Sequence, residues 1–114
     1  MIKIEIQRQN NRITYFEIKG HADFSGFGED VICAAVSSVG QMTINGLIET
    51  LKLQKKLEYV EKDGLITCDL KDSELTDDEL EKADILIESM YSYLKAVARS
   101  YSEFVRLEEK IEKK

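Results

Sequence analysis

Residues 2–20, "IKIEIQRQNNRITYFEIKG", contain two runs of strand-forming residues joined by a turn. In the first run isoleucines alternate with charged or polar residues, which is the period of a half-buried strand. Asn10 and Asn11 tolerate the left-handed backbone of a tight turn, and the second run is rich in β-branched and aromatic residues. The stretch therefore predicts a β-hairpin whose second strand ends at Gly20.

The segment 31–48 contains no charged side chain. Its length is near the lower limit for a membrane-spanning helix, but it includes serine, glutamine, threonine, asparagine and glycine, which do not suit hydrocarbon. A helix buried in a protein core is the better interpretation. With Asp30 as N-cap, this helix is predicted to begin near residue 30 and to run to about Leu53.

The second half of the chain predicts another hairpin and another helix. Asp63 and Gly64 are the strongest turn signal in the chain, and they lie between two short runs of strand-forming residues. Cys68 shares the apolar side of the second run, so we expect it in the core. Thr76 and Glu79 form a capping box. Apolar residues then recur three or four apart, which predicts one long amphipathic helix.

The element order β-β-α-β-β-α predicts an α+β fold, with a four-stranded, largely antiparallel sheet covered by two long helices. At 114 residues the chain fits a single domain, 1–114, that is large enough for a hydrophobic core. Its charged end, from about residue 107, is expected to be a helical tail that frays into solvent. The order of the strands does not follow from the sequence.

Charge and cysteine content argue against several classes of protein. The net charge is −6, with +1 in residues 1–57 and −7 in residues 58–114. An acidic chain without a basic stripe repels phosphate backbones, so no direct nucleic-acid binding is expected. One histidine and two scattered cysteines are a poor ligand set, so neither a metal nor a cofactor is expected. The charged N-terminal residues show no apolar signal region, which predicts a cytoplasmic protein with reduced thiols and no membrane partner.

The connection between the first hairpin and the first helix holds the only histidine, His21, and one of the two cysteines, Cys33. It is long, and its glycines permit unusual backbone angles. Cys33 is predicted in the first helical turn, where the helix dipole and free N–H groups stabilise a thiolate and an oxyanion. His21 could act there as general base. On spacing alone, however, a cysteine near the start of an apolar helix is more often a packing residue than a nucleophile.

The motif "GHA" at 20–22, followed by "DVICAAVS" at 30–37, resembles the signature of the bacterial ribosomal-processing cysteine protease (Prp) family. The resemblance implies a cytoplasmic, homodimeric cysteine endopeptidase. It implies that the substrate is the precursor of the large-subunit ribosomal protein numbered twenty-seven. The enzyme would remove its N-terminal extension and cut after a pair of aromatic residues. Cys33 would be the nucleophile and His21 the general base.

The resemblance also implies that the glycine-containing loop orders over the substrate. The loop residues concerned are Gly20, Ala22, Phe24, Gly26, Phe27 and Gly28. An apolar groove for the aromatic pair could involve Phe24 or Phe27. Asp30 and Ser37 are candidates for a supporting group beside the thiol and the imidazole, and a dyad without a third group is also possible.

Two other functions stay open from the sequence. A non-catalytic binding or escort module for the same precursor would need the groove but no reactive thiol. A thiol-based redox sensor would need Cys33 and Cys68 within bridging distance, which the predicted core position of Cys68 disfavours. An unreactive Cys33 alongside saturable peptide binding would favour the escort module.

Overall fold

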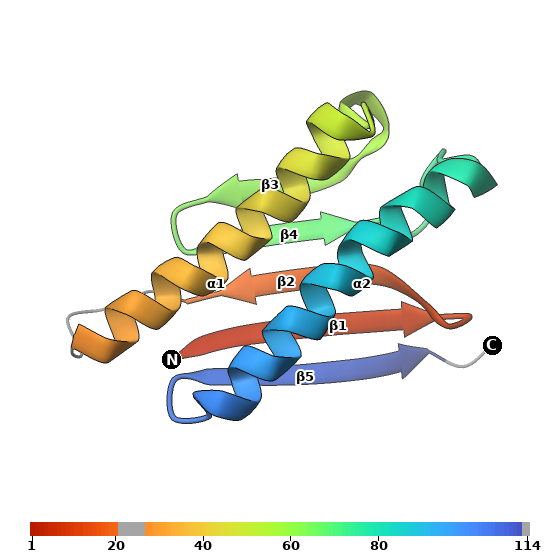
Figure 1. Ribbon diagram of the computed structural model, residues 1–114. Helices are drawn as coiled ribbons and strands as arrows, with labels where there is room; N and C mark the ends of the chain where they lie inside the picture. The colour runs from red at the N-terminus through yellow and green to blue at the C-terminus, as the bar shows by residue number, and fades with distance from the viewer. Residues whose placement is uncertain (21–26, 113–114) are drawn as a thin grey trace.

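The computed structural model describes residues 1–20 and 27–112. A five-stranded mixed sheet carries two long helices on one face, which gives the molecule two layers (Figure 1). The strands are β1 Ile2–Gln9, β2 Arg12–Lys19, β3 Glu58–Lys62, β4 Leu65–Asp69 and β5 Val105–Glu112. The helices are α1 Phe27–Asn45 and α2 Asp77–Ser100, with a π-helical turn η1 Gly46–Thr50 and a 3-10 turn η2 Gln54–Lys56 after α1.

Both predicted hairpins are confirmed. β1 pairs antiparallel with β2, and β3 pairs antiparallel with β4. Asn10 and Asn11 in the first turn have φ angles of 54° and 65°, and Gly64 in the second has a φ of 78°. These are the left-handed angles that tight hairpin turns require. The strand order β3-β4-β2-β1-β5 places the first hairpin in the interior of the sheet.

The core lies between the helices and the sheet face that they cover. The alternating isoleucines Ile2, Ile4 and Ile6 of β1 are at most 2% exposed. Cys68 of β4 is also buried, which confirms its predicted core position. On α2 the buried positions follow the predicted spacing: Ala83, Ile87, Met90, Leu94 and Val97.

The predicted start of α2 is also confirmed. The Thr76 hydroxyl accepts a hydrogen bond from the Glu79 N–H at 3.1 Å, and the Glu79 carboxylate accepts one from the Thr76 N–H at 2.9 Å. This reciprocal pair satisfies N–H groups that have no partner within the helix.

The prediction of a helical tail from about residue 107 is wrong, and so is the four-stranded, largely antiparallel sheet. α2 ends at Ser100, and the charged segment after it forms β5, which pairs parallel with β1. Val105 pairs with the buried Ile2, and Leu107 pairs with Ile4. Pairing with β5 satisfies the outer backbone groups of β1, which a four-stranded sheet would have left open at its edge.

A cluster around Arg8 fastens β5 to the rest of the fold. The Arg8 guanidinium donates hydrogen bonds to Glu88 of α2 at 2.6 and 2.9 Å. It also lies 3.4 Å from Glu109 of β5 and 5.0 Å from the centre of the Tyr91 ring. The Tyr91 hydroxyl donates to Glu109 at 2.7 Å, and this bond, together with the Arg8 charge, lowers the pKa of Glu109. Arg8 therefore connects β1, α2 and β5.

Replacing Arg8 by methionine is expected to lower the free energy of unfolding by about 1–2 kcal/mol, because Glu88 loses its charged partner. The melting temperature at pH 7 should fall by about 4–10 °C in thermal unfolding followed by circular dichroism. A lowered pKa means that the Glu109 contribution is present above its ordinary value of 4.5 and is lost as the pH falls through the folded-state value. The difference between wild type and Arg8→Met should therefore shrink in acid.

The matched control is Lys82→Met, which breaks the exposed pair between Lys82 and Asp78 within α2. Such exposed pairs contribute about 0.5 kcal/mol or less. Equal melting temperatures for Arg8→Met and Lys82→Met at pH 7 would contradict the role of Arg8.

Candidate active site

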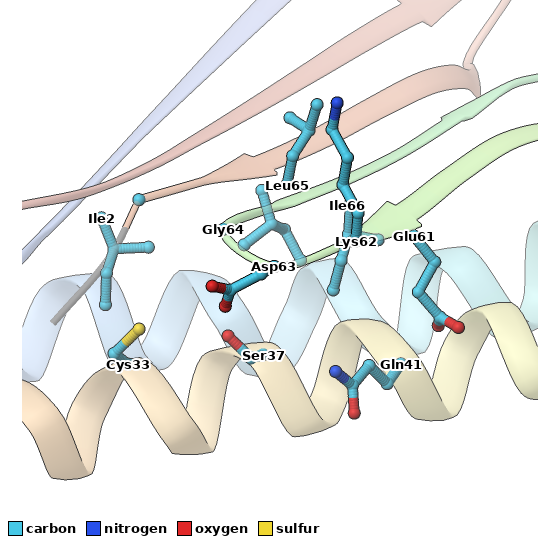
Figure 2. A pocket seen from close by; sticks show the side chains of 12 residues that line it. Ile2, Cys33, Ser37, Gln41, Glu61, Lys62, Asp63, Gly64, Leu65 and Ile66 are labelled. Carbon is cyan, nitrogen blue, oxygen red and sulfur yellow. The ribbon is translucent and has the colours of Figure 1, made fainter.

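Cys33 lies at one end of a pocket of about 310 Å³ between α1 and the turn that joins β3 to β4 (Figure 2). From α1 the pocket is lined by Cys33, Ser37 and Gln41, which are four residues apart and therefore share one face of the helix. Residues 61–66 form the opposite wall. Ile2, Ile18 and Gly20 complete the lining near the thiol and beneath the helix.

Gly40 sets the distance between α1 and the sheet. A Cβ atom at this position would lie 2.7 Å from Cδ1 of Ile18 and 3.1 Å from Cδ1 of Ile66. Only glycine therefore permits the observed approach without movement of these side chains. Ile32 and Val36 are buried beneath the same helix, and Cys33 is half-buried at its edge, where it also faces the pocket.

Gly20 fixes the point at which the chain leaves β2. Its N–H donates a hydrogen bond to the carbonyl of Gly64 at 3.1 Å. Its φ of +142° suits glycine alone, and a Cβ atom here would lie 2.7 Å from the carbonyl oxygen of Met1. Because Gly20 and Cys33 line the same pocket, the residue that directly precedes His21 lies at the wall of the thiol site.

The predicted site residues fall into three groups. Cys33, Ser37 and Gly20 come together in one pocket. Phe27, Gly28 and Asp30, the first two predicted in the loop, lie in the first turn of α1. The other four, His21, Ala22, Phe24 and Gly26, lie outside the described residues.

The predicted start of the first helix near Asp30 is wrong, because α1 begins at Phe27. Acidic residues suit the first helical turn as well as the cap, so Glu29 and Asp30 did not define the boundary. Cys33 is consequently in the second turn of α1. Its own N–H is not among the free N–H groups of the helix start, and the dipole effect is concentrated in the turn before it.

Two parts of the pocket were not predicted from the sequence: the wall formed by residues 61–66, which we call the hairpin wall, and Gln41. Asp63 and Gly64 were identified only as a turn, because nothing local shows which helix a turn will face. Gln41 carried a signal, since it continues the spacing of Cys33 and Ser37 along the uncharged helix.

The two thiols have different environments. Both cysteines are free, so no disulfide joins them. Cys68 is fully buried, and burial, followed by the charge of Asp69, raises the pKa of its thiol to about 12. The described residues contain no group of three or more side chains suited to hold a metal ion.

Iodoacetamide at pH 8 is expected to modify Cys33 in the folded protein and to modify Cys68 at least about 100-fold more slowly. The reagent attacks thiolates, and Cys68 is both inaccessible and un-ionised at this pH. Mass spectrometry of tryptic peptides gives the two rates separately. In 8 M urea both should react, and similar rates in the native protein would contradict the assignment of Cys33 as the accessible thiol.

A free, half-buried thiol in a pocket between a helix and a hairpin fits a thiol-dependent hydrolase. Residues 1–106 match the model of the cysteine protease Prp family. The chain therefore belongs to this family of ribosomal-processing proteases and is a cysteine peptidase.

Relatives and solved structures agree with this membership. The chain is 32% identical to the ribosomal processing cysteine protease Prp of Bacillus subtilis over 108 residues, which cover 94% of this chain and 96% of the relative. A crystal structure of SMU.848 from Streptococcus mutans is 28% identical, has a TM-score of 0.78, and aligns over 98% of this chain and 96% of its own. The Prp of Staphylococcus aureus in complex with a substrate peptide shares the fold, with a TM-score of 0.76, 23% identity, and coverage of 96% and 100%.

Proposed function

We propose that this peptidase cleaves the N-terminal extension from the precursor of the large-subunit ribosomal protein numbered twenty-seven, in the cytoplasm, with Cys33 as nucleophile and His21 as general base. The observation that carries the proposal is the position of Gly20. It lines the Cys33 pocket, and His21 is the next residue. The family membership supplies the reaction class, and the names of the relatives indicate ribosomal processing.

In the proposed reaction the Cys33 thiol transfers its proton to the His21 imidazole, and Sγ attacks the carbonyl carbon of the scissile peptide bond. As the carbon–nitrogen bond breaks, the proton passes to the leaving amine, and the C-terminal product departs. Water then attacks the thioester with His21 as base. This step releases the N-terminal product as a carboxylic acid and restores the thiol.

Cleavage after an aromatic pair requires an apolar surface near the thiol. Ile2 and Ile18 supply apolar side chains in the lining of the Cys33 pocket. Ser37 lies one helical turn from Cys33 and presents a hydroxyl to the same pocket, which suits a supporting hydrogen bond to substrate or imidazole. Asp30, in the first turn of α1, remains the alternative candidate for this supporting group.

The proposal includes a homodimer, and the outer face of the helices supports it. Val31 and Met42 of α1 and Tyr93 of α2 are each more than half exposed. Between α1 and α2 an apolar groove of about 600 Å³ is open on this face. Only 33% of the apolar segment Val31–Thr50 is buried within one chain. A second copy would cover this surface, and sedimentation equilibrium measures the assembly.

The test of the function uses a peptide with an aromatic pair and a control peptide in which two alanines replace the pair. Mass spectrometry should find a single cut after the aromatic pair, and the control should be cut at least about tenfold more slowly. Equal cleavage of both peptides would contradict the proposed substrate. Saturable binding of an intact, uncut peptide would instead favour the escort module that the sequence left open.

A further inference from the structure

The hairpin wall of the Cys33 pocket separates its charges between the two sides of the sheet. Glu61 of β3 pairs with Ile66 of β4, which is buried beneath the helices. Directly paired residues project to the same side of a sheet, so the Glu61 side chain lies on the helix side. Lys62 pairs with Leu65 and therefore projects to the opposite side. Lys19 of β2 also pairs with Leu65 and lies on that far side.

Figure 2 shows the same separation. The carboxylates of Glu61 and Asp63 are directed toward α1, whereas the Lys62 ammonium points away from the helix. Asp63 lies over Ser37, and Glu61 lies on the side of Gln41. Among the side chains of residues 1–20 and 31–112, neither carboxylate has a salt-bridge partner.

The facing helix supplies no compensating charge. Between Val31 and Ile48 the sequence has no lysine or arginine. The two α1 residues that line this part of the pocket, Ser37 and Gln41, are neutral and polar. Two carboxylates therefore face the uncharged part of α1 across the groove in which the substrate chain would lie, and a cationic group would meet both of them there.

We propose that Glu61 and Asp63 select a substrate with a lysine or arginine side chain about two to four residues from the scissile bond. This inference rests on the proposed endopeptidase function. Ser37 and Gln41 lie about 6 and 12 Å along α1 from Cys33, at a rise of about 1.5 Å per residue. An extended peptide covers about 3.3 Å per residue, which gives the stated separation. The Gln41 amide is placed to hydrogen-bond the main chain of the same peptide.

The expected preference is moderate, because both carboxylates are exposed and solvent screens their charges. We expect lysine at the selected position to raise kcat/KM by about three- to tenfold over glutamine, mainly through KM. The preference should weaken as the salt concentration rises from 50 to 500 mM, since the Debye length then falls below about 5 Å.

The experiment uses a parent peptide with uncharged side chains and an aromatic pair at the cut site. In the test peptides one lysine stands in turn at each of the four positions on either side of the bond, and in the reference peptides glutamine stands there. The enzyme variants are Glu61→Gln and Asp63→Asn, alone and combined. Asp63→Asn preserves the fold, because Asn-Gly suits the same hairpin turn. Glu58→Gln is the matched control: Glu58 is also on β3, but it pairs with Asp69 on the side of the sheet away from the helices.

We expect one lysine position to be preferred by the wild type and by Glu58→Gln, and the preference to be lost in the double variant. Equal rates for all peptides with the wild type would overturn this inference and leave the proposed function standing. A preference that persists in the double variant would overturn it as well. If the wild type cuts none of the peptides, the proposed function fails and this inference fails with it.

Discussion

Replacing Cys33 by alanine is expected to lower kcat/KM for the precursor peptide by at least about 1,000-fold. In the proposed reaction Sγ of Cys33 forms a covalent bond with the substrate carbonyl carbon, and an alanine methyl group cannot form it. Cys33 is the thiol that faces the pocket, and Cys68 is enclosed in the core, so no other cysteine can replace it. Chromatography of the peptide mixture over several hours measures the residual rate.

The loss should come from chemistry and not from the fold. Cys33 is only half-buried and makes no disulfide, so the variant should lose less than about 1 kcal/mol of stability. Circular dichroism and thermal melting check this, and peptide binding by fluorescence anisotropy should remain within about threefold of the wild type.

Cys68→Ala is the matched control, because it also removes one thiol. Its side chain is fully buried, so this variant should be less stable by about 1–2 kcal/mol and yet retain its activity at 15 °C. Wild-type cleavage by Cys33→Ala would overturn the assignment of the nucleophile. A folded Cys68→Ala protein without activity would show that the reactive thiol had been misidentified.

Local patterns in the sequence were sufficient for most of the elements. Strict alternation in β1, two asparagines at the first turn and the Asp63-Gly64 turn each determine structure within a few residues, and all three are confirmed. The capping box at Thr76 is confirmed for the same reason. In each of these cases the physical cause lies within the segment itself.

β5 shows why the rest could not be predicted. After Val105 and Leu107 the alternation breaks, and four of the five residues 108–112 are charged. That composition is typical of a frayed tail, but it also suits an edge strand, where charges prevent pairing with other molecules. The segment becomes a strand because β1, about 100 residues earlier, has an open edge beside it. A parallel pairing over that separation leaves no local signal.

The candidate site, too, was predicted only in part. The spacing of Cys33 and Ser37 predicted one helix face, and both residues line the pocket. The opposite wall consists of the β3–β4 turn, which reaches the pocket only because β4 pairs with β2 and β2 ends at Lys19, directly before Gly20. This wall is a consequence of sheet order, which the sequence did not reveal.

Replacing Gly20 by alanine is expected to lower the free energy of unfolding by about 2–4 kcal/mol. The φ of +142° is unfavourable for any residue with a Cβ atom, and that atom would lie 2.7 Å from the Met1 carbonyl oxygen and 3.0 Å from the Ile2 Cα. Both neighbours are backbone atoms at the start of β1, so no side-chain rotation can relieve the contact. In urea unfolding the midpoint should fall while the slope stays unchanged.

Gly46→Ala controls for the general effect on stability of replacing a glycine by alanine. A Cβ atom at Gly46 would meet only Cδ1 of Leu86, at 3.1 Å, and Gly46 has no positive φ. We expect its stability to stay within about 0.5 kcal/mol of the wild type, because the end of the leucine side chain can move and alanine is the better helix former.

The activity of Gly20→Ala separates two roles of this glycine. If Gly20 only permits β2 to end, the variant should recover wild-type kcat/KM at 10 °C, where it is still folded. We expect instead a loss of at least about tenfold, because any backbone shift at Gly20 displaces the hydrogen bond to Gly64 and moves the starting point of His21 relative to Cys33. A folded Gly20→Ala protein with full activity would mean that the backbone position of Gly20 does not govern the approach of the His21 imidazole to the Cys33 thiol.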